Sequence, residues 1–285
     1  MESPADGLRD LARALSTVGR EVRDCVRAAR TATDHDVVRT EGGDDVYGSD
    51  ARAEEALLAG LASHVAERWP GSIVMEGFDA PQPVGVGGSW VFLADPVDGT
   101  RPFLAGLRSA WVLLGAGRDA TTLEDLEVGV AVEIPTERAA VGRVAWAVHG
   151  RADGAAATER AIWCVDEDLV GDADPVGVAL VPSGRTDASR TFVTVVRLLA
   201  GDHGPIGRWA DAHLAGLEVD DDMHPCSANL LMGVASGSTS AVLDARPLFH
   251  PDGLHTHPYD LAALVLYREA GASSKPCPPA RSTDR

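Results

Sequence analysis

Two carboxylates that follow a short apolar run are the clearest chemical feature of this chain. The run at residues 90–94 leads into Asp95-Pro96-Val97-Asp98-Gly99-Thr100. A strand ending at Asp95 would leave both acids beyond its carboxyl end, where their oxygens and the Val97 carbonyl could bind Mg²⁺. Gly99 would let the backbone approach a ligand closely, and Thr100 could cap a following helix whose free N–H groups favour an anion. The spacing therefore indicates a site for a divalent metal and a phosphate.

The same residues also have a purely structural interpretation. Asp-Pro and Asp-Gly pairs are common in turns, so this stretch alone could be an ordinary strand-to-helix turn. A lone Asp50 or Asp260 would more often cap a helix than bind a metal, and a lone Glu76 would be a loop acid. Only several acids in a recognisable order favour the metal site.

The composition indicates a globular protein with a strong negative charge. The chain has 285 residues, 45% of them hydrophobic, which suffices for a sizeable core in one large domain or two closely joined halves. The formal net charge is −18 and Lys275 is the only lysine, which argues against a nucleic-acid surface and would repel a phosphate ester at long range. Divalent cations would have to reverse the negative charge at the site before a phosphate could bind there.

Two further features bear on the location of the protein. No apolar run approaches the roughly 18 residues that a membrane span needs, and the first six residues lack the basic and apolar regions of a signal peptide. We therefore expect a cytoplasmic protein with no membrane partner. The cysteines lie far apart without a CxxC pair, so we expect buried or idle thiols rather than a zinc knuckle or a disulfide framework.

Helical and strand patterns alternate along the first half of the chain. Apolar residues recur at helical spacing over residues 8–29, with arginines on the other face, which predicts an amphipathic helix. We then expect, in order, a loop or short hairpin at 31–48, a helix at 53–68, a strand at 73–75, a loop at 79–89, and strands at 90–94, 111–116, 127–134 and 143–148.

The second half is predicted to continue as α/β structure. The expected elements are further α/β segments at 178–181 and 206–209, a helix at 188–199 despite its β-branched residues, and helices at 226–236 and 261–270. Asp260 would be the N-cap of the last helix, and Gly271 would follow its end. We expect an N-terminal half over residues 1–150 with most metal ligands, a C-terminal half over 151–275 with Asp260 and the specificity region, and a frayed tail at 276–285.

Four segments, in order, resemble the inositol monophosphatase family of Mg²⁺-dependent, lithium-sensitive sugar phosphatases. They are Gly48-Ser49-Asp50 with Glu54-Glu55 (family T-x-x-D), Ile73-Val74-Met75-Glu76 (strand ending in G-E-E), residues 95–100 (D-P-[IL]-D-G-T), and Tyr259-Asp260-Leu261-Ala262-Ala263 with Glu269-Ala270-Gly271 (W-D-x-A-A and E-A-G). Cys226-Ser227-Ala228 is also similar to the family's G-S-A helix start. The resemblance spans most of the chain and implies an α/β layered sandwich, αβαβα, of the sugar-phosphatase type.

The resemblance also implies roles for individual residues. Two or three Mg²⁺ ions would be held by Glu76, Asp95, the Val97 carbonyl, Asp98 and Asp260. Catalysis would depend on Glu76 and Thr100, which position the attacking water, and on Asp50, which orients water near the most weakly held ion. Substrate binding would depend on Gly99, Thr100, Ser227, Asp244 and Arg39. The expected reaction is hydrolysis of a small phosphomonoester, such as an inositol, sugar, cyclitol or nucleoside phosphate, without a covalent intermediate. Relatives are often dimers, so we expect a homodimer.

The chain also departs from the family pattern. Gly77 stands where relatives have a second Glu and Met75 replaces a Gly, so the water-activating end has one carboxylate fewer. The segment 245–259 is longer than in relatives and contains His250, His255 and His257, which could reshape the substrate mouth or bind a transition metal, although loop histidines usually face solvent. Asp220-Asp221-Asp222 could ligate an ion but is typical of a solvated turn.

Several functions remain open on the sequence alone. Fructose-1,6-bisphosphatase, histidinol-phosphatase and 3′(2′),5′-bisphosphate nucleotidase activities occur on the same scaffold, and the region 220–260 does not choose among them. A phosphate-ligand-binding protein that has lost turnover is the alternative of another class, suggested by Gly77. A nucleic-acid protein is disfavoured by the charge.

Overall fold

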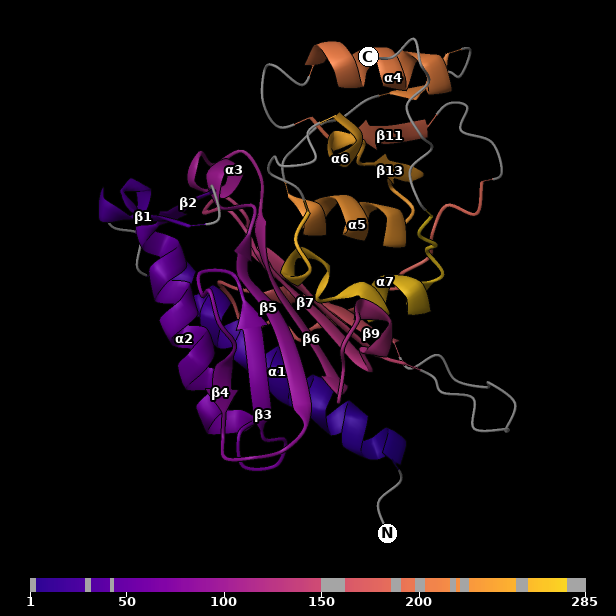
Figure 1. Ribbon diagram of the computed structural model, residues 1–285. Helices are drawn as coiled ribbons and strands as arrows, with labels where there is room; N and C mark the ends of the chain where they lie inside the picture. The colour runs from indigo at the N-terminus through magenta and orange to yellow at the C-terminus, as the bar shows by residue number, and fades with distance from the viewer. Residues whose placement is uncertain are drawn as a thin grey trace.

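The structure is a computed structural model, which describes residues 4–28, 32–41, 44–149, 162–185, 191–197, 203–215, 219–220, 226–249 and 256–275. Helices and sheets are stacked in alternating layers, αβαβα, as Figure 1 shows from α1 and α2 at one side to α4 at the other. The predicted fold class is therefore confirmed.

A large mixed sheet forms the centre of the molecule. Its strand order is β10-β9-β8-β7-β6-β5-β3-β4, and every neighbouring pair is antiparallel except β3 and β5. The strands are β3 (Gly71–Met75), β4 (Gln82–Val84), β5 (Trp90–Asp98), β6 (Ala110–Arg118), β7 (Val128–Ile134), β8 (Val141–Val148), β9 (Ile162–Asp168) and β10 (Val176–Gly177). The middle strands are apolar on both faces because helices cover both sides.

Helices α1 (Pro4–Ala28) and α2 (Gly48–His64) cover one face of this sheet (Figure 1). The apolar residues of α1 that recur at helical spacing, such as Leu11, Leu15 and Val18, are fully buried against the sheet. Arg20 of α1 also donates a hydrogen bond to Glu167 of β9. The amphipathic opening helix is therefore confirmed.

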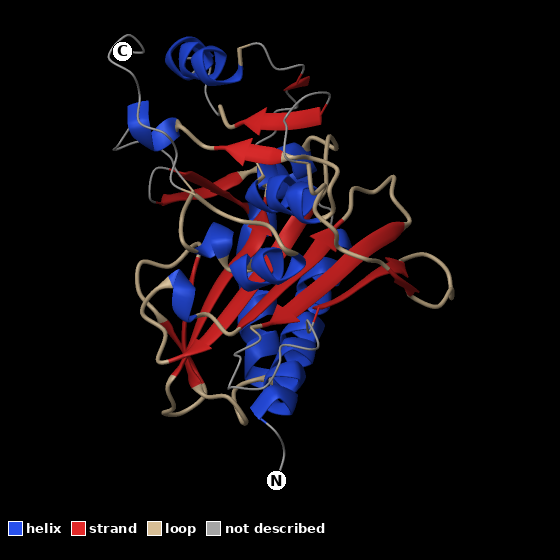
Figure 2. Ribbon diagram, turned by 90° about the vertical axis from the view of Figure 1, so that its right-hand side faces the viewer, coloured by secondary structure: helices blue, strands red, loops and turns tan. Residues whose placement is uncertain are grey.

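The opposite face carries α5 (Ser227–Ala235) and α7 (Leu264–Ala270), which form a second apolar cluster with the sheet. Beyond them lies a parallel sheet in the order β12-β11-β13, formed by β11 (Thr191–Val195), β12 (Val219–Asp220) and β13 (Ala241–Leu243). Helices α4 (His203–Leu214) and α6 (Arg246–Phe249) lie beside this sheet, at the end of the molecule away from the N-terminus (Figure 2). They contribute to an apolar cluster around the buried Trp209.

The remaining elements are short. The expected hairpin at 31–48 is present as β1 (Val37–Glu41) and β2 (Asp44–Tyr47), preceded by the 3₁₀ helix Ala32–His35. Helix α3 (Thr100–Leu104) follows β5, and further 3₁₀ turns lie at Leu123–Asp125 and Tyr259–Leu261.

The structure corrects several predicted elements. Residues 191–195 form β11 rather than part of a helix, because β-branched side chains fit a pleated strand better than a helix. Strand β4 interrupts the expected loop at 79–89, pairing with β3 at its edge. Residues 206–209 belong to α4, and 178–181 lie outside regular structure. The last predicted helix divides into the turn Tyr259–Leu261 and α7, although Gly271 does end α7 with the expected positive φ of 103°.

The proposed division near residue 150 stays a prediction. The strands that follow it, β9 and β10, extend the same sheet as β3–β8. The tail 276–285, His250, His255, Asp221 and Asp222 lie outside the described residues. None of the described helices is long and apolar enough to cross a membrane.

Candidate active site

The parallel pairing of β3 with β5 brings the first two acids together. Met75 is opposite Ala94, and the Glu76 N–H donates to the Ala94 carbonyl at 3.2 Å. Glu76, which follows the end of β3, and Asp95, within β5, therefore lie side by side at the same end of this strand pair. The Asp95 carboxyl shares hydrogen bonds with Glu76 and with Asp260 from the far end of the chain.

The strand β5 does not end at Asp95 as expected but continues to Asp98. Its pairing with β6 shifts register between the two acids, since Asp95 is opposite Leu113 and Asp98 is opposite Trp111. Residues three apart on a regular strand point to opposite faces, and this bulge changes that alternation. Both carboxylates consequently line the same cavity.

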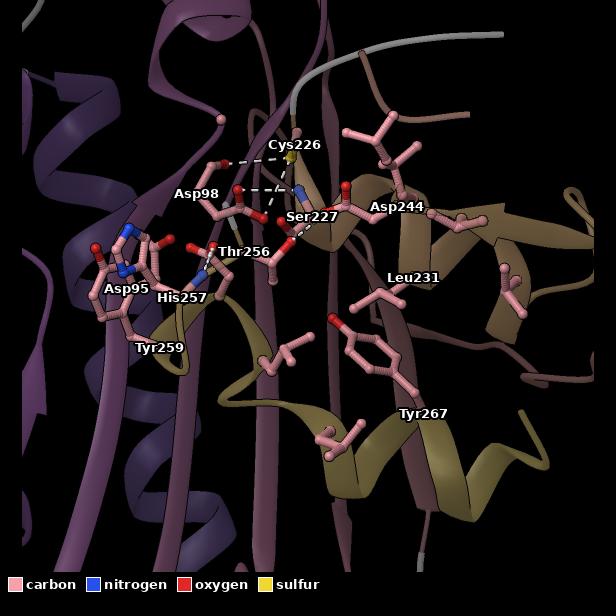
Figure 3. A pocket seen from close by; sticks show the side chains of 18 of the residues that line it. Asp95, Asp98, Cys226, Ser227, Leu231, Asp244, Thr256, His257, Tyr259 and Tyr267 are labelled. Atoms are coloured by element: carbon pink, nitrogen blue, oxygen red, sulfur yellow. Dashed lines mark hydrogen bonds between the residues drawn. The ribbon is translucent and has the colours of Figure 1, made fainter. Parts of the chain in front are cut away.

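Asp98 contacts the beginning of α5. Its carboxylate accepts hydrogen bonds from the backbone N–H groups of Ser227, at 3.2 Å, and Ala228, and from the Cys226 thiol at 3.6 Å (Figure 3). The charge therefore lies where the unpaired N–H groups of a helix favour an anion. Sequence reasoning missed Cys226 as part of this site. The signal was its position in the G-S-A-like motif, where the family pattern has Gly.

Asp50 and Thr100 form a second acidic unit of the same cavity. The Tyr47 N–H donates to Asp50 Oδ2 at 2.8 Å, and the Thr100 hydroxyl lies 2.8 Å from Asp50 Oδ1 and 2.9 Å from the Val97 carbonyl. Thr100 is therefore not a helix cap. Gly99, at a φ of 91°, precedes α3, and this helix is a single turn of five residues rather than a long helix whose N-terminus could bind phosphate.

Asp260 reaches the site from a 3₁₀ turn, so the expectation that it caps α7 is wrong. Its Oδ2 accepts a hydrogen bond from the His257 N–H at 2.7 Å, and Ala263 precedes α7 instead. The His257 ring stacks on Tyr259, with centroids 5.0 Å apart and planes at 6°. His257, from the histidine-containing segment, thus has a local role beside Asp260.

Burial and crowding of like charges shape the electrostatics of the site. Burial raises the pKa of Asp95 well above its usual range, and the charges of Glu76, Asp98 and Asp260 raise it further. Burial, followed by the charge of Asp260, raises the pKa of Asp98 to about 7 against the opposing hydrogen bonds from α5. Burial likewise raises the pKa of Asp260. Four acids from distant segments therefore share a space that favours either added protons or a cation.

The chemistry of this donor set fits a hard divalent cation. All of its side-chain donors are carboxylate oxygens, the ligands that Mg²⁺ prefers, and Val97, whose carbonyl accepts a hydrogen bond from Thr100, lines the same cavity. Within the described ranges, no group of three His, Cys, Asp or Glu side chains is arranged so that all three could ligate one metal ion. Their oxygens instead hydrogen-bond to backbone N–H groups and to one another. The fit is thus one of donor type, burial and charge.

The expected substrate residues are only partly brought to this cavity. Gly99, Thr100, Ser227 and Asp244 line it. Asp244 is already engaged, because Arg246 binds both of its oxygens, at 2.9 and 2.8 Å, and Thr256 donates to Oδ2 at 3.1 Å. Sequence reasoning missed Arg246, whose spacing two residues after Asp244 was the available signal.

Arg39 lies apart from the other candidates. Its Nη2 donates to Glu54 Oε1 at 2.5 Å and to the Gly77 carbonyl at 3.1 Å, and it borders a separate hollow with Thr40, Phe78 and Asp79. A Cβ on Gly77 would lie 2.1 Å from Glu54 Oε1 and 2.5 Å from Arg39 Nη2. The position where relatives have a second Glu is therefore filled by this ion pair.

Comparison with solved structures places this geometry among known folds. No protein-family model and no curated protein matches the sequence. SuhB of Mycobacterium tuberculosis superimposes with a TM-score of 0.63 at 20% identity, over 93% of this chain and 86% of that one. The chain has the inositol monophosphatase fold. The inositol monophosphatase of Anabaena gives a TM-score of 0.59 at 14% identity, over 93% of this chain and 83% of its own.

A further solved structure superimposes well on this chain. A putative sedoheptulose-1,7-bisphosphatase of Toxoplasma gondii superimposes with a TM-score of 0.68 at 14% identity, covering 93% of this chain and 82% of its own. The resemblance seen in the sequence motifs is thus confirmed at the level of the fold. At these identities, the chemistry has to be argued from the site itself.

Proposed function

We propose that this chain is a metal-dependent phosphatase that hydrolyses a small phosphomonoester with an activated water. The observation that carries the proposal is the convergence of Glu76, Asp95, Asp98 and Asp260 at one end of a cavity, next to the hydrogen-bonded pair of Asp50 and Thr100. A structural role alone does not explain two buried acids, Asp95 and Asp98, with two half-buried acids beside them, because bringing like charges together away from water is costly without a cation.

In this proposal the acids hold two or three Mg²⁺ ions, together with the Val97 carbonyl. The ions would polarise the phosphoryl group, favour deprotonation of a water and stabilise the leaving oxygen. No covalent enzyme intermediate is required.

The chain's own residues orient the reactants. With its proton directed to Asp50, the Thr100 hydroxyl keeps a lone pair to accept a hydrogen bond from the attacking water, and Glu76 supplies a second acceptor. The amides at the start of α5 fix the orientation of Asp98, while Gly99 and Ser227 border the position of the phosphate. The Arg39–Glu54 pair has a positioning role through the loop at Gly77.

The substrate class proposed is a small phosphate ester. The neighbouring folds include structures named as inositol monophosphatase, fructose-1,6-bisphosphatase and putative sedoheptulose-1,7-bisphosphatase, which supports a sugar-phosphatase type of chemistry. A cytoplasmic homodimer remains the expected form of the enzyme.

The direct test is phosphate release from a panel of inositol, sugar, aryl and nucleoside monophosphates with Mg²⁺. We expect release that EDTA abolishes and that Asp95→Asn lowers at least about a thousandfold, with Glu124→Gln as the control for an exposed acid. Binding without release from any ester would instead support the phosphate-binding alternative.

A further inference from the structure

The cavity that holds the acids continues into an apolar arm between α5, β13 and α7. The arm is lined by Leu231 and Val234 of α5, Leu243 of β13, and Leu264 and Tyr267 of α7. Figure 3 shows Leu231 and Tyr267 next to each other, on the side of the cavity away from Asp95. The whole cavity measures about 870 Å³, near the upper end for small-molecule sites, so it exceeds the space of a phosphate and its metals.

Tyr267 adds a polar group to the apolar side chains of this arm. The residue is 2% exposed, and its hydroxyl has no hydrogen-bond partner among the described residues. In Figure 3 the hydroxyl points from α7 into the cavity toward Leu231. An unpaired buried hydroxyl is unfavourable for folding, so a partner supplied by a ligand would account for it.

Asp244 argues against a ligand covered with hydroxyl groups. Arg246 and Thr256 donate hydrogen bonds to its carboxylate, which leaves little of it to receive the hydroxyls of a polyol. The arm itself offers leucine and valine side chains, against which each unpaired ligand hydroxyl would be unfavourable.

From these observations we infer that the apolar arm binds the non-phosphate half of the substrate, and that this half is a flat, mainly apolar ring with one hydrogen-bonding atom opposite the Tyr267 hydroxyl. The substrate is thus an aryl or heteroaryl phosphate ester rather than a polyol phosphate. This inference rests on the proposed phosphatase function and adds its substrate class.

Binding of two phosphonates tests the arm without turnover, because their C–P bonds are not hydrolysed. With Mg²⁺ present, we expect benzylphosphonate to bind at least about tenfold more tightly than methylphosphonate in calorimetry. Leu231→Gln should remove most of this preference. Leu107→Gln, at a residue that is 74% exposed and outside the cavity, should leave it unchanged. Equal affinities for the two phosphonates in the wild type would overturn the inference.

Tyr267→Phe tests the hydroxyl. At least one of the three hydroxybenzylphosphonate isomers should bind more tightly than benzylphosphonate to the wild type, and the variant should lose this advantage while still binding benzylphosphonate. Its unfolding temperature should equal or exceed that of the wild type, since an unpaired buried hydroxyl is removed. An advantage that survives in the variant would refute the role of Tyr267.

Turnover separates this inference from the proposed function. Release of phosphate from myo-inositol 1-phosphate with a higher kcat/KM than from phenyl phosphate, unaffected by Leu231→Gln, would refute the substrate class and leave the phosphatase intact. A preference for benzylphosphonate without release from any ester would refute the phosphatase and leave the arm as a ring-binding site.

Discussion

Replacement of Gly77 by alanine probes the ion pair that fills the site of the missing acid. Gly77 has a φ of +87°, and a Cβ there would meet Glu54 Oε1 at 2.1 Å and Arg39 Nη2 at 2.5 Å. Gly87 offers a matched control, because its φ is +69° and nothing lies within 4 Å of the corresponding Cβ. Both substitutions place a residue with a Cβ in the left-handed backbone conformation, but only Gly77→Ala also brings the Cβ into collision with Glu54 and Arg39.

The contributions of the backbone conformation and of the collision to the loss of unfolding free energy can be estimated separately. The left-handed conformation costs about 1–2 kcal/mol for a residue with a Cβ, which is the whole expected effect of Gly87→Ala. Gly77→Ala should also displace the partly buried Arg39–Glu54 pair, adding about 1–3 kcal/mol. We therefore expect Gly77→Ala to lower the free energy of unfolding by about 2–5 kcal/mol.

Urea denaturation of both variants at pH 7 measures this difference, and a Glu54→Ala background tests its cause. Removing the Glu54 carboxylate opens part of the space and takes away a partner that holds the end of the flexible Arg39 side chain in place, so Arg39 can move aside and Gly77→Ala should then cost no more than Gly87→Ala. If Gly77→Ala is as mild as Gly87→Ala in the wild-type background, the collision argument is refuted. By the same reasoning, Gly77→Glu should not restore the acid of relatives but should destabilise the fold.

Two further predictions concern the reaction and the packing of α1. Thr100→Val keeps the volume of the side chain but removes the hydroxyl that is hydrogen-bonded to Asp50. We expect kcat to fall at least about a hundredfold with little change in KM. An unchanged kcat would exclude Thr100 from orienting the water. Burial alone would raise the pKa of Glu167, but hydrogen bonds from Arg20 and Arg23 outweigh it and hold the pKa below the ordinary value of 4.5. The carboxylate therefore stabilises the fold above pH 4.5 and loses this effect as the pH falls through the lowered pKa. In urea denaturation, Glu167→Gln should lower the free energy of unfolding by about 1–2 kcal/mol at pH 7 and by much less at pH 3. An equal loss at both pH values would contradict this.

Patterns that depend on neighbouring residues predicted the fold well. The helical spacing of apolar residues in α1 and the apolar runs of β6, β7 and β8 follow from burial of these residues, so the sequence pattern shows them directly. The segment 191–195 was predicted as part of a helix despite its β-branched residues, whereas these residues pair in register with β13. Tertiary pairing decided that element, and local sequence patterns do not show which distant segment is the pairing partner.

The acids of the site were predictable, but their contacts were not. Asp50, Glu76, Asp95, Asp98 and Asp260 each stand in a motif, so their order indicated one site. The bulge between Asp95 and Asp98, the thiol of Cys226 and the Asp244–Arg246 pair depend on segments far apart in the chain. Local spacing does not determine such contacts. The roles assigned to these residues in catalysis and metal binding stay predictions.

Metal binding tests the central claim most directly. Titration of Mn²⁺ as a Mg²⁺ substitute, followed by electron paramagnetic resonance, should show at least one ion bound to the wild type and to Glu124→Gln, with at least about tenfold weaker binding to Asp95→Asn. Without metal, Asp95→Asn should unfold at the same temperature as the wild type or higher, because a buried like charge is removed. Equal Mn²⁺ affinity in the wild type and Asp95→Asn would contradict the account.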